Sequence, residues 1–393
     1  MSDGSEKLLK ELERRKAEDE AKAAEKADSD SHNSSHRRHR HHHHHDPKAR
    51  RRRRRRRKLR KVKKIMLRTL IFLGVIILIA AVTVFVMRHT GKNEMTAEDF
   101  NIKAPESLDV QISDKGSHVV FEGKQYEYNK DIICMLILGI DQVSGVDDRQ
   151  IGDNMQSDLI ALCAIDSVNK KITIINIPRD IITDVKVYSP SGGYVEMKKL
   201  PIAEAFAYGD GKKGSCFNSA EAVSKLFYNL PIRTFFALNL DGIAELTDSV
   251  GGVDVVSPET IGEFEKGESY HLEGKKATNF VRRRATDRAD ANLLRNDRQK
   301  EYLKSIINKF FKATRSNISV PVNVFNAVQS YSSTNLNPDR VTYLATEFIV
   351  NRNMDRQFKS VPVTVKQVDN HAENYVKEKE FYIMFLDIFY NEK

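Results

Sequence analysis

A run of 19 residues without a charged side chain, from Thr69 to Met87, constrains this chain more than any other feature. At about 1.5 Å of rise per helical residue, such a run reaches across a hydrocarbon layer of about 30 Å. β-Branched side chains occur on every side of the segment and no polar face appears, which argues against a core helix. The run is also longer than the apolar part of a cleaved signal peptide. We therefore predict one transmembrane helix over residues 65–88.

Positive charge gathers on one side of this run. Arginine fills positions 50–57 and five more basic residues follow by Lys64, whereas the far side offers only Arg88, His89 and Lys92 close by. The positive-inside rule then places the N-terminus in the cytoplasm and the rest of the chain outside, where no supply of nucleoside triphosphate can be assumed. Anionic membrane lipids are the expected partners of the basic run. Nucleic acid is not expected, because no aromatic residue is interleaved with the charges.

The net charge of +10 reflects the N-terminal tail alone. Residues 1–64 hold 24 Lys and Arg against 11 Asp and Glu, so the remainder of the chain is mildly acidic. We expect this tail to be cytoplasmic and disordered, because its composition is charged and of low complexity. Its five consecutive histidines, residues 41–45, leave a metal-binding tract as an alternative reading.

Patterns of strands and helices begin further along the chain. Residues 89–130 show only short alternations, and we expect a stalk or accessory strands there. From residue 131, apolar strands alternate with helical stretches, which indicates a single extracytoplasmic α/β domain with a central mixed sheet flanked by helices. The expected strands are 132–140, 159–165, 172–177, 235–240 and 253–256, and the expected helices are 203–208, 219–228 and 242–250.

The cysteines are three in number, and two of them fall within predicted strands. Cys134, Cys163 and Cys216 are therefore expected to be buried thiols. A bridge between Cys134 and Cys163 is the alternative, because their strands could be neighbours in an oxidising compartment.

Acidic residues stand at the ends of three predicted strands. Asp141 follows the first strand, Asp158 opens the second, and Arg179 and Asp180 follow the third. Open α/β sheets usually place their ligands at such strand ends. Three carboxylates and an arginine in this position suit a metal ion and an anionic substrate.

A second group of charges is rich in arginine. A short helix after Gly274 ends in Arg282-Arg283-Arg284, and Arg282 and Arg284 can converge only if the helix terminates there. Arg295 and Arg298 then share one face of the next helix. Guanidinium forks suit phosphate oxygens, so these four arginines are candidates to border one pocket. The alternative is a solvated helix face paired with Asp287, Asp290 and Asp297.

The order of these blocks resembles the LytR-CpsA-Psr family. The resemblance covers residues 132–317 and includes Gly139-Ile140-Asp141, Ser157-Asp158, Ile177-Pro178-Arg179-Asp180, Val250-Gly251-Gly252-Val253 and Arg295-Asn296-Asp297-Arg298-Gln299. It implies a catalytic domain over residues 131–317 and a variable C-terminal part, 318–393, packed on it. It also implies a membrane-anchored phosphotransferase that moves an anionic glycopolymer, such as teichoic acid or capsular polysaccharide, from an undecaprenyl diphosphate carrier onto peptidoglycan through a phosphodiester bond.

The resemblance assigns roles to individual residues. Asp141 and Asp158 would hold Mg²⁺, with Mn²⁺ as an alternative; Arg179, Arg282 and Arg284 would grip the diphosphate; Arg295 and Arg298 would complete the basic rim. Three departures from the family pattern matter: Asp148 is an alternative ligand to Asp141, Gln156 replaces an arginine, and Asn292 stands where aspartate is common, so that Asp290 is a candidate for its role.

The chemistry of these side chains agrees with a phosphoryl transfer. Mg²⁺ is usually held by one or two carboxylates together with phosphate, and catalysis of such transfers consists mainly of positioning and charge stabilisation. In this reading Asp158 and Arg179 are catalytic, and Asp180 or Asp290 accepts the proton of the attacking sugar hydroxyl. The polyprenyl chain needs an apolar slot, for which the candidates, each also readable as plain core, are Phe206, Leu226, Phe227 and Phe280.

Two other functions are compatible with the sequence. The same site could act as a diphosphatase if water replaced the sugar hydroxyl. A non-catalytic envelope regulator that binds a polyprenyl-linked polymer is the alternative from another class, and the long basic tail motivates it.

Overall fold

The computed structural model describes residues 47–96, 99–141, 151, 155–284, 291–351, 353–368 and 371–393. The predicted disordered tail up to residue 46, with its histidines, lies outside the described residues. The chain divides into two compact units, residues 1–75 and 76–393. The α/β domain belongs to the second unit.

One long helix, α2 (Pro47–Met95), contains the predicted transmembrane segment. It extends beyond the predicted bounds of 65–88 at both ends, so residues 47–64 are helical where we expected disorder. Proline suits the first turn of a helix, and the Arg and Lys residues that follow are good helix formers. The segment Lys58–Met95 is long and apolar enough to cross a membrane, and its apolar side chains are exposed.

A six-stranded mixed sheet forms the centre of the domain, in the order β12-β9-β4-β5-β6-β13. β4 pairs antiparallel with β5 and β5 with β6, whereas β9 runs parallel to β4 and β13 parallel to β6. The mixed α/β fold class predicted from the sequence is therefore confirmed. The strand bounds are β4 Ile132–Ile140, β5 Ser157–Asp166, β6 Lys171–Asn176, β9 Thr234–Asn239, β12 Ser332–Thr334 and β13 Asp355–Ser360.

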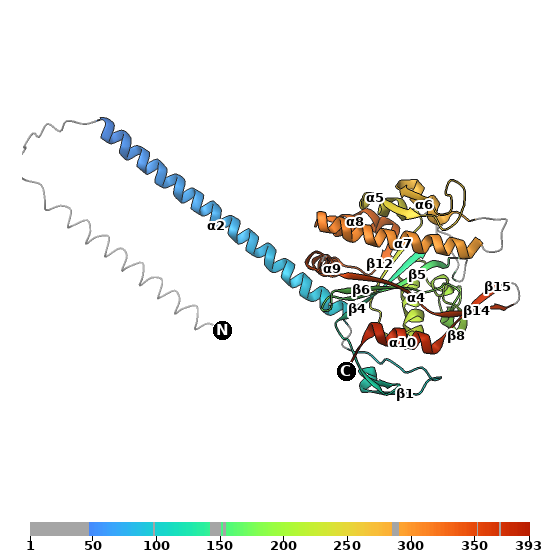
Figure 1. The fold of residues 1–393 in the computed structure, drawn as a ribbon. Helices are drawn as coiled ribbons and strands as arrows, with labels where there is room; N and C mark the ends of the chain where they lie inside the picture. Colours follow the sequence, from blue (N-terminus) through green and yellow to red (C-terminus); the bar gives the residue numbers. More distant parts are fainter. Residues whose placement is uncertain are drawn as a thin grey trace, which may run out of the picture. The chain divides into compact units, whose positions relative to one another are not determined.

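Helices cover both faces of this sheet (Figure 1). Alternate residues of a strand point to opposite faces, so Leu136 and Leu162 pack on one side and Ile133 and Ile165 on the other. The first face is covered by α3 (Glu204–Ala207), α4 (Lys213–Leu226) and α10 (Glu378–Phe389). The second is covered by α5 (Gly242–Ser249), α7 (Ala291–Ser316), α8 (Val320–Val328) and α9 (Pro338–Val350), with α6 (Gly274–Arg282) packed beyond α5.

The C-terminal part is more deeply built into the fold than its predicted role as a packed-on extension suggests. Residues 318–393 supply both edge strands of the central sheet, β12 and β13. They also supply β16 (Tyr390–Glu392), which completes a small sheet with β1 (Val110–Ser113), β2 (His118–Phe121) and β3 (Lys124–Tyr128). This small sheet contains the accessory strands predicted within residues 89–130.

Three two-stranded ribbons and two single turns complete the described structure. The ribbons are β7 (Ile182–Tyr188) with β8 (Tyr194–Pro201), β10 (Val253–Val256) with β11 (Ser269–Leu272), and β14 (Val363–Val368) with β15 (His371–Val376). The 3₁₀ turns are η1 (Asp114–Gly116) and η2 (Gln329–Tyr331).

The three cysteines are free and buried, as predicted. Cys134 and Cys163 lie on neighbouring strands, but Cys163 is directly opposite Met135 rather than Cys134. Their side chains therefore point to opposite faces of the sheet, which explains why the alternative bridge does not form.

Candidate functional site

One edge of the sheet collects the strand-end residues singled out in the sequence. β4 ends at Ile140, which pairs with Ser157 at the start of β5, so Asp141 and Asp158 come from adjacent strands at the same edge. β6 runs antiparallel to β5 and leads to Arg179 at the same edge. The pairing shifts between Gly139 and Ile140, and a β-bulge of this kind commonly redirects side chains beside a functional site.

Asp158 lies between two guanidinium groups. Arg179 Nη1 contacts Oδ1 of Asp158, and Arg295 Nη1 lies 3.2 Å from Oδ2. The three side chains are only 12%, 17% and 11% exposed for Asp158, Arg179 and Arg295, respectively. Charge pairs with this little contact with water are screened less by salt than surface pairs. This triad is the centre of the site.

Arg179 is held by its neighbours on several sides. Its Nη2 donates to Oε1 of Gln156, and its Nε lies 3.5 Å from Oδ1 of Asp180. Its carbonyl accepts a hydrogen bond of 3.1 Å from the N–H of Ala203, at the start of α3. Burial lowers the pKa of Arg179, which Asp180 partly offsets, but the group remains charged at neutral pH. Gln156 thus serves as a hydrogen-bond acceptor for Arg179.

Two further arginines were expected to reach this cluster from the end of α6. The helix terminates at Arg282, as convergence of Arg282 and Arg284 requires. Arg284 is exposed and close enough to the cluster to lower the pKa of Arg295, second to the effect of burial. Arg282 is exposed at the last turn. Between them, Arg283 lies against Gly262, where an added Cβ would sit 1.4 Å from its Nη1.

Arg298 lies elsewhere than the sequence suggested. Its side chain is fully buried and pairs with Glu259. Its Nε donates to the carbonyl of Phe280 at 2.8 Å, and its Nη2 donates to the carbonyl of Arg283. Arg298 therefore binds the C-terminal end of α6 from inside the protein, and it does not border the cluster with its guanidinium as we expected.

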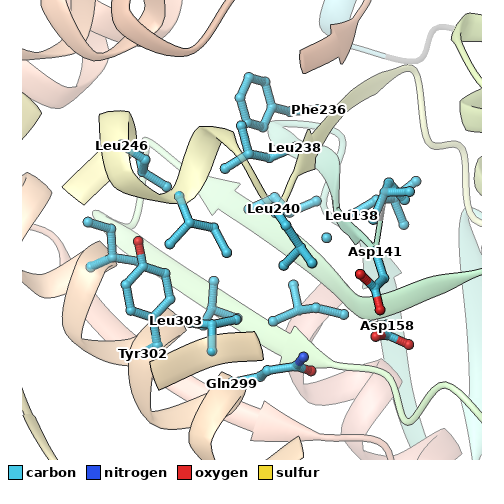
Figure 2. A pocket seen from close by; sticks show the side chains of 17 residues that line it. Leu138, Asp141, Asp158, Phe236, Leu238, Leu240, Leu246, Gln299, Tyr302 and Leu303 are labelled. Atoms are coloured by element: carbon cyan, nitrogen blue, oxygen red, sulfur yellow. The ribbon is translucent and has the colours of Figure 1, made fainter. Parts of the chain in front are cut away.

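An apolar cavity of about 100 Å³ opens beside the two carboxylates. Figure 2 shows Asp141 and Asp158 at one end, with leucine side chains between them and Tyr302. The polar side chains of its wall are Asp141, Asp158, Gln299 and Tyr302, and the other side chains are apolar. The hydroxyl of Tyr302 shares a hydrogen bond of 2.8 Å with the hydroxyl of Thr247. The aliphatic wall comes from β4, β9, α5, α6 and α7, and includes Ile137, Leu240, Ile243, Val281, Leu303 and Ile306.

A second cavity, of about 240 Å³, adjoins the first. The two share part of their lining, and the second lies between the sheet and α7, α8 and α9, with almost no polar surface. The slot residues proposed from sequence lie elsewhere: Phe206, Phe227 and Phe280 are fully buried in the cores, and Leu226, the last residue of α4, is partly buried against the core beneath that helix. The residues that line both cavities are Ile137, Phe236, Leu246, Leu303 and Ile306.

Two predicted site residues, Asp148 and Asp290, lie outside the described residues. Asp141 is exposed at the cavity mouth and electrostatically close to Arg179 and Arg295. Asp180 lies beside the same cluster, because its Oδ1 is 3.5 Å from Nε of Arg179.

Sequence reasoning did not identify two acidic residues of this region. Glu259, the buried partner of Arg298, follows a Ser-Pro pair in a loop, and no spacing rule connects it to an arginine 39 positions further along the chain. Glu204, at the start of α3, is half-buried and near Arg179 and Lys198. Burial raises the pKa of its carboxyl, while those two cations partly offset the rise. Its helix was predicted, but an acid at a helix start is too common to signal a site.

The carboxylate oxygens of Asp141 and Asp158 are of the ligand type that Mg²⁺ prefers. Within the described residues no group of three His, Cys, Asp or Glu side chains is placed to hold a metal ion. Mg²⁺ is commonly bound by only one or two carboxylates, with phosphate and water completing its shell. Asp141 and Asp158 line one cavity mouth and offer that number.

The fold and site together define a class: an α/β protein with a candidate membrane helix, whose site suits an anionic head group attached to an apolar chain. The family can be stated directly, because the model of the LytR_cpsA_psr family matches residues 85–384. The chain belongs to this family, as the sequence indicated.

Curated relatives carry transferase names. A polyisoprenyl-teichoic acid–peptidoglycan teichoic acid transferase TagU of Oceanobacillus iheyensis is 28% identical over 256 residues, 64% of this chain and 71% of the relative. A protein of the same name from Bacillus cereus is 30% identical over 214 residues, 53% of this chain and 62% of the relative.

Solved structures share the fold. A protein of Streptococcus agalactiae matches with a TM-score of 0.53 and 18% identity, over 66% of this chain and 86% of the other. The TagV protein of B. subtilis matches with a TM-score of 0.50 and 20% identity, over 66% of this chain and 96% of the other.

Proposed function

We propose that this protein is a membrane-anchored phosphotransferase that moves an anionic glycopolymer from an undecaprenyl diphosphate carrier onto peptidoglycan. One observation carries the proposal: the cluster of Asp158, Arg179 and Arg295 lies at the mouth of an apolar cavity, where the strands β4 and β5 meet at one end of the sheet. A polyprenyl diphosphate has the matching parts, an anionic head and an apolar chain. The names of the curated relatives support the same substrate class.

The arginines would bind the diphosphate. Arg179 and Arg295 contact Asp158 through Nη atoms, and the buried Nε of Arg295 has no hydrogen-bond partner within the described part of the chain. A phosphate oxygen is a suitable acceptor for such a donor, and charge-assisted bonds of this kind are about twice as strong as neutral ones. Arg284 and Arg282 would add positive charge from the end of α6.

Asp141 and Asp158 would hold Mg²⁺ or Mn²⁺, which when bound neutralises charge on the diphosphate oxygens. Asp158 would at the same time keep Arg179 and Arg295 oriented through the contacts described above. Gln156 supports the orientation of Arg179 from its other side.

In the transfer step, the oxygen of a peptidoglycan sugar hydroxyl forms a bond to the glycan-linked phosphorus. The bond from that phosphorus to the bridging oxygen of the diphosphate breaks, and polyprenyl phosphate leaves with the electron pair. The hydroxyl proton passes to a carboxylate, for which Asp180, beside Arg179, and Asp290 are the candidates. The product is a phosphodiester between glycopolymer and peptidoglycan.

The cavities would hold the start of the polyprenyl chain. Their aliphatic lining removes the chain from water, which contributes roughly 25 cal/mol per Å² of apolar surface. The carboxylate end of the first cavity would then place the diphosphate beside Asp141 and Asp158, so that chain binding and head-group positioning support one another.

Helix α2 would anchor the enzyme, with its N-terminus in the cytoplasm and the α/β domain outside. The charge asymmetry around the apolar run supports this orientation. The basic start of the helix would contact anionic lipid head groups at the inner surface.

The test uses the full chain in lipid nanodiscs with a short glycan on polyprenyl diphosphate, Mg²⁺ and peptidoglycan oligomers. Mass spectrometry should find a glycan–phosphate–peptidoglycan adduct and polyprenyl phosphate. Arg179→Ala and Asp158→Ala should each lower the rate by about 10²–10³, the effect of removing one group that stabilises transition-state charge.

Arg283→Ala is the matched control, because Arg283 neighbours the same arginines in sequence but lies against Gly262. The Arg283→Ala variant should catalyse the transfer at the same rate as the parent protein. Release of glycan phosphate with no adduct would indicate a diphosphatase instead, and tight binding without turnover across several glycans would favour the regulator.

A further inference from the structure

The outer end of α2 is packed against α9. Arg88 pairs with Glu347, and Glu94 Oε2 lies 2.9 Å from Nε of Arg340. Between them, Gly91 lies so close to α9 that a Cβ there would be 2.2 Å from the carbonyl oxygen of Asp339. These contacts join the last turns of α2 to the domain.

The two ion pairs show which end of α9 lies nearer to the apolar run. Glu347, near the C-terminal end of α9, pairs with Arg88, which directly follows Met87 at the end of that run. Arg340, near the start of α9, pairs instead with Glu94, further from the run. Val350 lies three residues beyond Glu347, about 4.5 Å further along α9 at the helical rise of about 1.5 Å per residue.

This end of the domain exposes large aliphatic side chains. Val350 is 73% exposed, Ile318 in the turn between α7 and α8 is 62% exposed, and Val322 on α8 is 45% exposed. The elements that carry them are neighbours, because α8 and α9 line one cavity, and the ring of Phe311 on α7 packs edge to face against that of Phe348 on α9, with 5.0 Å between the ring centroids.

Exposed cations border the same edge. Lys312 and Arg315 lie on the last turns of α7, just before Ile318. Aliphatic side chains flanked by basic residues are typical of surfaces that lie in the interface of a bilayer, where the aliphatic groups enter the acyl region and the cations contact head groups.

We propose that the edge formed by the α7–α8 turn, α8 and the end of α9 is a membrane-contacting surface. Ile318, Val322 and Val350 enter the bilayer that α2 spans, and the inference rests on the proposed anchoring by that helix. The contact would hold the cavity between α8, α9 and the sheet beside the membrane, so that the carrier lipid has a short path from the bilayer to the site.

The absence of tryptophan from the chain makes a direct test possible. Single variants Val350→Trp, Phe85→Trp and Val365→Trp would each be reconstituted as the full chain in phosphatidylcholine–phosphatidylglycerol vesicles, with and without bromine on the acyl chains. Phe85 lies in the apolar run, and Val365 is 62% exposed on β14, on the opposite side of the domain from α9. All three positions are exposed, so the substitutions leave the core intact.

The proposal expects bromine to quench Val350→Trp to an extent comparable with Phe85→Trp, with a blue-shifted emission, and to leave Val365→Trp unchanged. If Phe85→Trp is quenched and Val350→Trp behaves like Val365→Trp, the result supports anchoring by α2 and contradicts the proposed membrane contact of the α8–α9 edge. If Phe85→Trp is not quenched, the anchoring itself fails. A blue shift of Val350→Trp that depends on protein concentration but not on bromine would assign the surface to a second copy of the chain, which also overturns the proposal.

Discussion

Arg298 and Glu259 form an ion pair that is closed off from water, with side-chain exposures of 0% and 4%. Burial lowers the pKa of Arg298 to about 10, so the guanidinium is still charged at neutral pH. Because Arg298 also binds the carbonyls at the end of α6, the pair positions the segment that leads to Arg284.

Arg298→Met should lower the free energy of unfolding by about 3–5 kcal/mol, because removal of one partner leaves an uncompensated buried charge. The double variant Arg298→Met, Glu259→Leu should recover part of that loss, since it removes both charges. Urea unfolding of the single and double variants measures the coupling. A stable Arg298→Met variant that only loses substrate binding would return Arg298 to the substrate role suggested by the sequence.

Gly91→Ala should disturb the docking of α2. The new Cβ would overlap the carbonyl oxygen of Asp339, so one helix has to shift, which costs about 1–3 kcal/mol. Hydrogen exchange in nanodiscs should then show weaker protection of α9. Gly74→Ala is the matched control on the same helix, because nothing lies within 4 Å of its Cβ position, and equal protection in both variants would contradict the close approach.

The three thiols should be unreactive in the folded protein. Burial raises the pKa of Cys163 and Cys216 to about 12 and raises that of Cys134 as well, so little thiolate exists at neutral pH. A chromogenic disulfide reagent should modify none of them in buffer and all three in urea. Modification of the native protein at a rate independent of its unfolding would show that a thiol is accessible.

Glu204 should make stability depend on pH. Its carboxyl has a raised pKa, so the folded chain holds the proton more tightly than the unfolded chain does. The stability from this group is fully present below the ordinary glutamate pKa of 4.5 and is lost as the pH rises through the raised pKa of the folded chain. Glu204→Gln should remove that slope and be more stable than the parent at neutral pH.

Urea unfolding across a pH series would compare Glu204→Gln with the parent and with Glu263→Gln, a change at an exposed glutamate. A parallel pH profile for the parent and Glu204→Gln would show that Glu204 titrates alike in both states.

The local pattern predicted which residues meet at the sheet edge. Asp141, Asp158 and Arg179 each precede or follow an apolar strand, and once these strands pair, their ends lie close together at one end of the sheet. The same logic correctly required α6 to stop at Arg282. It did not reveal that Arg298, three positions after Arg295 on one helical face, enters the core, because spacing along a helix says nothing about what packs against that face.

By itself, then, the sequence determined the apolar helix, the mixed α/β class, the family and the strand-end acids, all of which depend on periodicity or on short contiguous blocks. The tertiary structure alone decided that Glu259 neutralises Arg298, that strands β12 and β13 from the C-terminal part close the sheet, and that the cavity is lined by Leu240, Ile243 and Leu303 instead of the predicted phenylalanines. These features join residues distant in the chain, and such contacts are chosen by the packing of whole faces rather than by any local preference.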